Sequence, residues 1–369
     1  MVHRGWVLLA VHPLCRFAST SGDGCMTSVA STLQRQLKKE RAQTSAHALL
    51  LRVESGDAGL TFDGSAGDAE PGMRFPIASI SKTFTAALTL KLADLGQLDL
   101  DQTVQSTLPR HDLSDFHVVK GVAHGPALTI RHLLFQTSGL ADYFKGGVEA
   151  DMIHNKDRAI DLAMVLAMAR SLPPMAAPDS GKAYYSDTNF QLLGAVLKAV
   201  SGKSYATLLQ DYICEPLGLR QTTTFDAENL PLPLFHKSQQ LTLPKSLASM
   251  DPDGGLVSTP EELIGFLRGF LGGHLFDPAW LDDVRNWKPM FFPLQYGGGL
   301  MRFQLPRWMT LWRPTPELIG HLGSSGSFAF YAPVPDIYLA GTFNQTDLPR
   351  RPVAFMLKVL RHLEKAGVT

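Results

Sequence analysis

Apolar residues near the beginning of the chain recur at two different spacings. In the segment SVASTLQRQLKKERAQ (28–43), Val29, Leu33 and Leu37 are four residues apart, which predicts an amphipathic helix with a basic outer face. The segments AHALLLRVES and AGLTFDGSAG then predict two short strands joined by a turn. A loop, PGMRFPIAS, leads into an apolar helix over ISKTFTAALTLKLADLG, and Gly96 predicts its end.

The character of the chain changes between Asp101 and Ser249. This part holds helical segments and irregular loops, among them LTIRHLLFQTSG, DRAIDLAMVLAMARSL and FQLLGAVLKAVSG, with few β-branched runs. After residue 253 come a helix in GGLVSTPEELIGFLRGFLG, the strand-like pieces QYGGGLMRFQL, LIGHLGSSGSFAFYAP and DIYLAGTFNQ, and a final helix in RRPVAFMLKVLRHLEKAG. Strands before and after the helical part would pair in one sheet.

These elements predict an α+β fold: an antiparallel β-sheet flanked by the N- and C-terminal helices, with an inserted, mainly helical lobe. The sandwich lobe would comprise residues 27–100 and 250–369, and the helical lobe residues 101–249. We expect an active site between the two lobes.

The first 26 residues are expected to be a disordered extension or a weak leader. Arg4 precedes a short apolar run, but His12 and Pro13 interrupt it, and no convincing small-residue cleavage site follows. A cytoplasmic protein is therefore favoured, whereas a periplasmic or secreted one would follow if residues 1–25 act as a leader. No later stretch approaches the ~18–20 uninterrupted apolar residues of a membrane span.

Composition and charge exclude several classes of partner. The 34 Lys and Arg residues balance 34 Asp and Glu residues over 369 positions, so no global field attracts nucleic acid. A hydrophobic content of 45% is typical of a globular enzyme. The cysteines Cys15, Cys25 and Cys214 have no metal-ligand spacing, and no phosphate loop or nucleotide motif occurs, so we expect neither a metal nor a cofactor. The oligomeric state is not encoded in any pattern we can read.

The strongest chemical signal lies in FPIASISKTF (75–84), where Ser79 and Lys82 are one helical turn apart. Their Cβ atoms would be about 5–6 Å apart on one helix face. A serine hydroxyl needs a neighbouring base, and a lysine serves as one only if burial or a nearby cation lowers its pKa. A helix N-terminus adds N–H groups that can hold an oxyanion. If no other motif were present, an N-cap serine followed by a surface lysine would explain this common spacing better than a catalytic pair.

Two further motifs change that balance: YSD (185–187) within YYSDTNFQLLG, and HLG (321–323) within GHLGSSGSFAF. With the Ser79–Lys82 pair, their order and wide spacing resemble the three motifs of the serine β-lactamase and penicillin-binding family, in its branch of class C β-lactamases, D-Ala-D-Ala carboxypeptidases and related esterases. The stretches LADLGQLDLDQTV, LTIRHLLFQTSGL and GGLVSTPEEL support the resemblance, which covers residues 46–345.

The resemblance implies a role for each motif residue. Ser79 would be the acylated nucleophile and Lys82 its proton acceptor or activator. Tyr185 would be a general base and acid, provided that cations such as Lys82 lower the pKa of its phenol from about 10; its alternative is aromatic packing. The backbone N–H groups of Ser79 and Ser324 would form the oxyanion hole, and Gly323 would let the strand approach the acyl group.

Two of the expected substrate-binding positions, Asp187 and Leu322, depart from the family pattern, and a third, His321, affects the charge of the site. Asp187 stands where asparagine is usual, so it can only accept hydrogen bonds, and it would hold Lys82 charged if the two pair. Leu322 replaces a threonine that would bind a substrate carboxylate. His321 could supply a partial positive charge, or could be a hydrogen-bonded strand histidine.

These departures favour a serine hydrolase that acts through an acyl-enzyme on carboxylic esters or related small acyl substrates. The alternatives are a D-Ala-D-Ala carboxypeptidase, a D-aminopeptidase or a weak β-lactamase, and, in another class, a non-catalytic structural or regulatory protein with this fold. The irregular segment LPLPLFHKSQQLTLPKSL (230–247) is expected near the cleft. Tyr143, Phe144, Tyr296, Phe328 and Phe330 are weaker candidates for its rim. The methionines at 152, 164, 168 and 175 are expected to pack in the helical core, with a flexible binding surface as the alternative.

Overall fold

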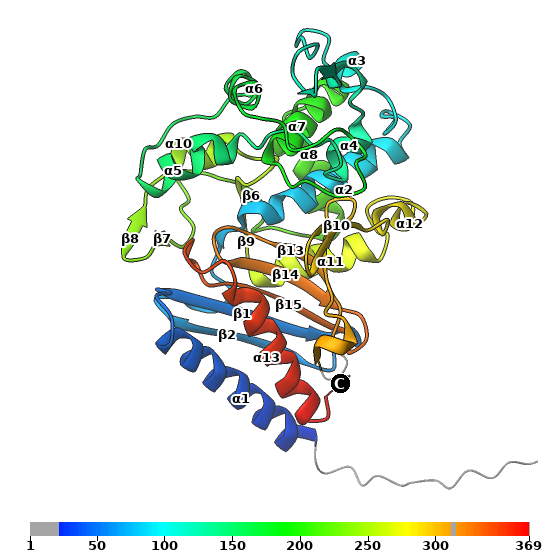
Figure 1. Ribbon diagram of the computed structural model, residues 1–369. Coiled ribbons are helices and arrows are strands. Elements are labelled where there is room, and N and C mark those ends of the chain that lie inside the picture. Colours follow the sequence, from blue (N-terminus) through cyan, green and yellow to red (C-terminus); the bar gives the residue numbers. More distant parts are fainter. Residues whose placement is uncertain (1–21, 311–314, 369) are drawn as a thin grey trace, which may run out of the picture.

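A single antiparallel sheet organises the half of the molecule drawn at the bottom of Figure 1. The computed structural model describes residues 22–310 and 315–368. The sheet has eight strands in the order β10-β11-β12-β13-β14-β15-β1-β2. Their bounds are β1 Ala48–Ser55, β2 Thr61–Gly67, β10 Lys288–Phe291, β11 Leu294–Tyr296, β12 Met301–Phe303, β13 Leu318–Leu322, β14 Ser327–Ala332 and β15 Ile337–Thr342.

The alternation of side chains in β1 shows why this sheet is covered on both faces. β1 pairs with β2 and, from the other end of the chain, with β15, where Arg52 lies opposite Ala340. Successive strand residues point to opposite faces. Leu49 and Leu51 accordingly belong to one hydrophobic core and Leu50 to the other.

The two terminal helices cover one face of the sheet, as predicted (Figure 1). They are α1 (Gly22–Ala42) and α13 (Arg351–Lys365). Leu33 and Leu37 of α1 pack in the same core as Phe355 of α13. Helix α1 begins at Gly22, so residues 22–26 belong to this helix and not to an extension. The remainder of the predicted extension or leader lies outside the described residues.

Helices α2 (Ser81–Asp94) and α11 (Pro260–Leu271) belong to the core on the opposite face. The predicted apolar helix therefore exists and ends just before Gly96, which has a left-handed φ of 68°. Phe84 of α2 stacks on Phe266 of α11 with ring centroids 3.6 Å apart. Because α2 is buried on nearly every side, it forms the centre of the molecule.

The remaining elements form mainly the helical lobe, drawn at the top of Figure 1. The helices are α3 Val104–Thr107, α4 Ile130–Leu134, α5 Glu149–Ile153, α6 Leu162–Ser171, α7 Asp187–Ser201, α8 Tyr205–Leu209, α9 Glu215–Leu217, α10 Pro244–Ser249 and α12 Trp280–Val284. Short 3-10 or π turns are η1 Ala78–Ile80, η2 Gly125–Ala127, η3 Phe144–Val148, η4 Gln210–Cys214 and η5 Arg307–Thr310. Small strands are β3 Phe75–Pro76, β4 Val118–Val119, β5 Val122–Ala123, β6 Thr223–Thr224, β7 Leu234–His236, β8 Gln239–Leu241 and β9 Leu256–Ser258. These small strands outside the main sheet, of two or three residues each, carry too little alternation to be predicted.

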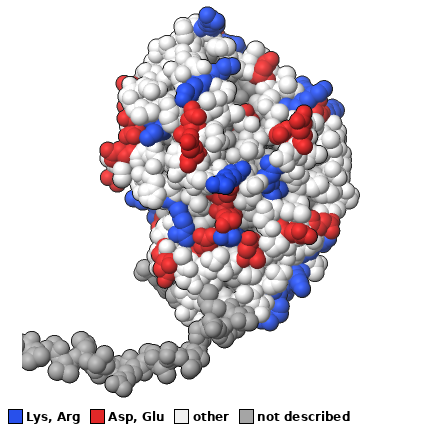
Figure 2. Space-filling view, turned by 180° about the vertical axis from the view of Figure 1, so that it is seen from behind, with Lys and Arg blue, Asp and Glu red and all other residues white. Residues whose placement is uncertain are grey.

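The predicted α+β fold is thus confirmed. Figure 2 shows basic and acidic side chains interspersed over one face, without a broad region of a single sign, as the balanced composition suggests. Within residues 22–310 and 315–368, no helix is both long and apolar enough to cross a membrane.

Candidate active site

Ser79 lies in a tight turn that the surrounding backbone holds in place. The turn, η1, connects β3 to α2, and the residue before Ser79, Ala78, has a left-handed φ of 46°. That conformation costs a residue with a Cβ roughly 1–2 kcal/mol. Ser325 and Ser327 stabilise the turn by donating hydrogen bonds of 2.7 and 2.8 Å to the carbonyls of the two residues before Ala78. Hydrogen bonds from β14 and from the turn before β14 therefore fix the position of Ser79.

Lys82 is fully buried beside Ser79. Its Nζ donates to Ser79 Oγ at 3.1 Å and to the carbonyl of Asp253 at 2.5 Å, and it lies 2.5 Å from Oδ1 of Asp187. Burial acts to lower the pKa of Lys82, but the carboxylates of Asp187 and Asp253 outweigh it, and the net shift is upward. The expectation of a lowered lysine pKa is therefore wrong. Asp187 does pair with Lys82, as the alternative requires, and its charge favours the protonated form of the lysine.

Tyr185 lies between Lys82 and the strand that carries the third motif. Its ring centroid is 5.2 Å from Lys82 Nζ and 6.1 Å from the ring of His321. Burial, and to a smaller extent the charge of Asp187, raises the pKa of Tyr185 well above its usual value. A hydrogen bond with Ser79 acts in the opposite direction but is outweighed. The predicted lowering of this pKa by Lys82 is wrong, since the nearby carboxylates and burial prevail. Tyr185 is a neutral phenol at neutral pH.

Gln136 positions the segment that carries Tyr185. Its backbone has a left-handed φ of 60°. Its carbonyl accepts from the N–H of Tyr184 at 2.7 Å, and its Oε1 accepts from the N–H of Ser186 at 2.9 Å. Tyr185 is therefore held from both of its chain neighbours.

Two carboxyl groups that the motifs did not mark complete the surroundings of Lys82. Asp253 accepts hydrogen bonds from the Tyr143 hydroxyl at 2.7 Å and from Gln191 at 2.9 Å, and burial raises its pKa to about 8. Oδ1 of Asp142 accepts from two backbone N–H groups, and burial, with the charge of Asp187, raises its pKa to about 7. Both residues lie in loops, where no spacing distinguishes a buried carboxyl from a solvated one.

The third motif lies at the end of β13. His321 is only 1% exposed, and its Nδ1 hydrogen-bonds the carbonyl of Leu322 at 2.7 Å. Burial and the charge of Lys82 lower the pKa of His321 to about 3, so the expected partial positive charge is absent and the histidine is a neutral strand residue. A Cβ on Gly323 would lie 2.4 Å from the carbonyl oxygen of Ile77. Only glycine therefore fits there, and the close approach is to the Ser79 turn.

Several of these side chains line one cavity of about 190 Å³. Its polar part includes Ser79, Tyr185, Asp187 and Ser324, whereas His321, Leu322 and Gly323 are not among its lining residues. The backbone N–H of Ser324 has no hydrogen-bond acceptor among the described residues. Ser79 and Ser324 thus face a common space although 245 positions separate them in the sequence.

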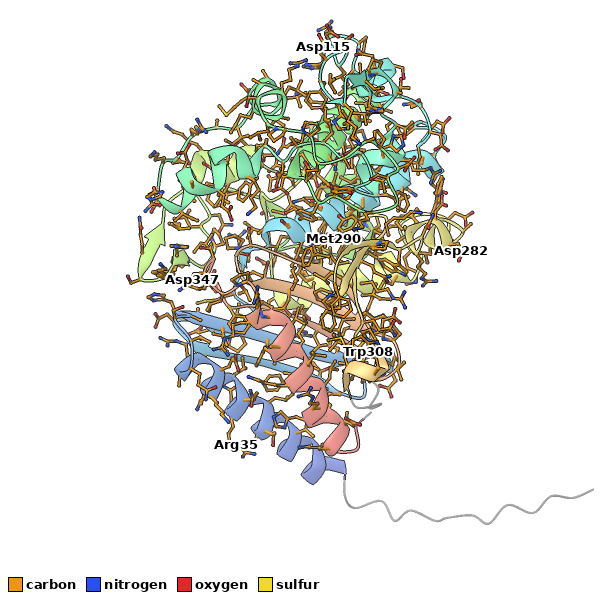
Figure 3. All side chains as sticks on the ribbon, viewed as in Figure 1. Arg35, Asp115, Asp282, Met290, Trp308 and Asp347 are labelled. Atoms are coloured by element: carbon orange, nitrogen blue, oxygen red, sulfur yellow. The ribbon has the colours of Figure 1, made fainter. Side chains whose placement is uncertain are left out.

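The rest of the cavity wall is apolar and comes from the helical lobe. The segment 230–247 contributes Leu234, Leu241 and Leu247, so its predicted place near the cleft is confirmed. Of the five aromatic candidates for the rim, Phe144 lines the cavity and the other four are buried in the core. Asp347, labelled in Figure 3, lies near the β7–β8 hairpin, and its neighbour Thr346 hydrogen-bonds Phe235 of that hairpin at 2.9 Å. In the described part of the chain, no group of His, Cys, Asp and Glu could hold a metal ion.

Comparison with known proteins gives a family match over most of the chain. The model of the Beta-lactamase family matches residues 54–362. Penicillin-binding protein 4 of Amycolatopsis lactamdurans is 29% identical over 221 residues, which cover 57% of this chain and 53% of that protein. Esterase EstB of Burkholderia gladioli is 32% identical over 160 residues, or 42% and 39% of the two chains. The chain therefore spans about half or less of the length of these relatives.

Solved structures match over nearly their whole length. A D-stereospecific amidohydrolase from Streptomyces sp. has a TM-score of 0.73 and 25% identity, covering 92% of this chain and 98% of that one. EstCE1, described as a hydrolase with promiscuous acyltransferase activity, has a TM-score of 0.72 and 18% identity, covering 93% and 100%, and shows the fold alone.

Proposed function

The chain belongs to the Beta-lactamase family, and from this premise we propose that it is a serine hydrolase that acts through an acyl-enzyme on uncharged carboxylic esters. The observation that carries the proposal is the contact of 3.1 Å between Lys82 Nζ and Ser79 Oγ, in a cavity that Tyr185 and Ser324 also line. A nucleophile, a proton-transfer group and a free backbone donor thus surround one space in which an ester carbonyl fits.

Ser79 is the proposed nucleophile, and Tyr185 the group that moves its proton. Ser79 Oγ attacks the carbonyl carbon and its proton passes to the oxygen of Tyr185, while the phenol gives its own proton to the departing alcohol. Tyr185 is neutral before and after this step, in agreement with its raised pKa. Water then attacks the acyl-enzyme by the reverse route and returns the proton to Ser79.

Lys82 remains protonated throughout in this mechanism. Its ammonium group, paired with Asp187, donates to Ser79 Oγ and stabilises the negative charge that develops on that oxygen as its proton leaves. The N–H groups of Ser79 and Ser324 are the proposed oxyanion donors. Such donors, when preorganised, contribute about 3–4 kcal/mol to the stability of a transition state.

An uncharged substrate fits the charges of the cavity better than a carboxylate does. Lys82 is paired with Asp187, and Lys145, the only cationic residue among those that line the cavity in the described chain, pairs with Glu149 at 2.6 Å. His321 is neutral. A β-lactam or a D-Ala-D-Ala peptide carries a carboxylate that would find no free cation here, and burying an unpaired charge is costly.

A D-amino-acid amidase is the second candidate. The carboxyl group of Asp142 lines the cavity and uses only its Oδ1 in the two backbone hydrogen bonds, so its other oxygen could accept from a substrate ammonium group. The Streptomyces amidohydrolase, with the same fold, has a name that points to such substrates.

Three chromogenic substrates of different charge test the proposal: a neutral p-nitrophenyl ester, a cationic D-alanyl p-nitroanilide and an anionic cephalosporin. We expect the ester to be cleaved fastest and the cephalosporin slowest. A fluorophosphonate should label the wild type and Ser114→Ala, an exposed-serine control, but not Ser79→Ala. Faster cleavage of the anilide would support the amidase, and equal labelling of Ser79→Ala would refute the assignment of the nucleophile.

A further inference from the structure

The cavity beside Ser79 has two chemically different ends. The polar end holds Ser79, Tyr185 and Ser324. The other end is lined by apolar side chains of the helical lobe, which come from η3, α5, the β7–β8 hairpin and α10: Phe144, Met152, Ile153, Leu234, Leu241 and Leu247.

This apolar end lies where two small hydrophobic clusters meet. One cluster includes Tyr143 and Met250, and the other includes Leu234 and Leu241, which face each other across the β7–β8 pair. Met152 packs against both clusters, which are separate from the two large cores. Met152, expected to pack in the helical core, therefore also forms a wall of the cavity, whereas Met175 is 39% exposed and the expected core packing is wrong for it.

Part of this end is shielded from water, whereas Phe144, Met152, Ile153 and Leu247 are half-buried. Leu234 and Leu241 are each 8% exposed and Met250 is 5% exposed. An apolar cavity of about 150 Å³ stays dry and can bind a benzene molecule. The whole cavity of about 190 Å³, its polar and apolar ends together, is therefore suited to an acyl group of about that size, with its carbonyl at the polar end and its chain at the apolar end.

The part of the substrate that stays on the enzyme suits the apolar end better than the part that leaves. In the proposed reaction the alcohol leaves after the first step, whereas the acyl group remains bonded to Ser79 Oγ until water releases it. An alcohol bound at the apolar end would have to give up its apolar contacts to leave. The acyl chain, in contrast, can keep these contacts through both steps.

We infer that the apolar end is an acyl-binding subsite, and that the substrates are esters of uncharged aliphatic or monocyclic carboxylic acids of about six carbons. This inference rests on the proposed hydrolase function. Acids with a second carboxylate are excluded, because Lys145 is already paired with Glu149 and the walls of this end provide no other cation among the described residues.

A series of p-nitrophenyl esters with acyl chains from acetyl to decanoyl tests the subsite. Burial of each methylene should raise kcat/KM about fourfold until the space is full. We expect a maximum near hexanoyl, followed by a decline. Esters with a fixed acetyl group and alcohols of increasing length should show no comparable rise.

Substitutions at Leu241 should move this maximum. Leu241→Phe reduces the space and should lower the hexanoyl-to-acetyl ratio of kcat/KM by about tenfold or more. Leu241→Ala enlarges it and should shift the maximum toward longer chains. The matched control is Leu243→Ala: Leu243 belongs to the same cluster and is 2% exposed, but does not line the cavity. It should lower the melting temperature and leave the ratio unchanged.

The outcomes separate this inference from the proposed function. If esters are cleaved in a Ser79-dependent way but the rates are flat with chain length, or if Leu243→Ala changes the ratio as much as Leu241→Phe, the subsite is refuted and the hydrolase stands. If no ester is cleaved and no fluorophosphonate labels Ser79, the hydrolase itself is refuted. A maximum near hexanoyl that moves with the size of residue 241 supports both.

Discussion

Asp187 lies beside the buried ammonium group of Lys82, and Asp187→Asn tests what its charge does. The substitution keeps the size of the side chain and introduces the residue that the resemblance leads us to expect there. It removes the carboxylate that lies 2.5 Å from the fully buried Nζ of Lys82. The asparagine amide oxygen can still accept a hydrogen bond from the ammonium group, so the variant changes mainly the charge.

The free energy of unfolding should fall by about 3 kcal/mol at neutral pH. Removing one partner of a buried ion pair typically costs about 3–5 kcal/mol, because the remaining charge is left unpaired. The lower end of this range applies because Asp253 can ionise in place of Asp187. Its pKa, about 8 in the wild type, is raised by burial and in part by the charge of Asp187, so it should fall in the variant.

The pH dependence should change in a definite direction. Because Asp187 raises the pKa of Lys82, the pairing stabilises the fold fully below the unfolded pKa of about 10.4 and is lost only as the pH rises through the higher folded value. Without Asp187, less negative charge opposes the effect of burial, so the pKa of Lys82 should be lower in the variant than in the wild type. If the ammonium group is required, the alkaline limb of kcat/KM should move to lower pH.

Urea unfolding at neutral pH and kcat/KM for a neutral ester between about pH 6 and pH 10 measure both effects. Asp211→Asn is the control, since Asp211 also forms a short ion pair, 2.7 Å from Lys203, but at the surface, where such pairs contribute roughly 0–1 kcal/mol. An alkaline limb that stays in place, or moves to higher pH, would refute the requirement for a protonated Lys82. A stability loss no larger than that of Asp211→Asn would refute the argument from burial.

Three further substitutions test other parts of the structure. Gly323→Ala should lower kcat/KM about a hundredfold or more. The Cβ of the alanine would lie 2.4 Å from the carbonyl oxygen of Ile77 and displace the turn that carries Ser79. An active variant with an unchanged KM would contradict this expectation. Tyr185→Phe should lower the acylation rate by about 10²–10⁴-fold in single-turnover experiments, and full acylation would exclude the proton transfer proposed for it. Asp251→Asn should raise the free energy of unfolding by up to about 4 kcal/mol at pH 8 and by much less at pH 4. Burial raises the pKa of Asp251 to about 7, so the unfolded chain loses this proton at a lower pH than the folded protein does. Equal effects at the two pH values in urea unfolding would show that the charge is not responsible.

Local patterns in the sequence were enough to predict the framework of the fold. The segment AHALLLRVES predicted the strand β1, and the spacing of Leu33 and Leu37 predicted the helix α1, in which both are buried. The SxxK spacing likewise predicted a contact between Ser79 and Lys82, because residues three apart on a helix are neighbours whatever surrounds them. Each of these predictions depends only on residues close together in the chain.

The electrostatics of the site could not be predicted in this way. The pKa of Lys82 depends on the balance between its burial and the carboxylates of Asp187 and Asp253, which are remote in sequence. The sequence places Lys82 on an apolar helix, where burial alone would shift the pKa downward, but the two carboxylates reverse the sign of the shift. For His321 burial and the charge of Lys82 outweigh the hydrogen bond with the carbonyl of Leu322, which acts to raise its pKa, so the imidazole stays neutral. The sign of each shift follows from tertiary contacts.

The polar and the apolar end of the cavity differ in how easily their residues can be substituted. Ser79 and Lys82 are fixed by α2 and by the strands against which it packs, and the close contacts of Gly323 leave little freedom there. The apolar end is built by the two-stranded β7–β8 sheet and short helices, whose clusters are separate from the large cores. Since the cost of a core substitution depends on how well the site can relax, substitutions at Leu241 should alter substrate choice at a smaller cost in stability than substitutions around Lys82.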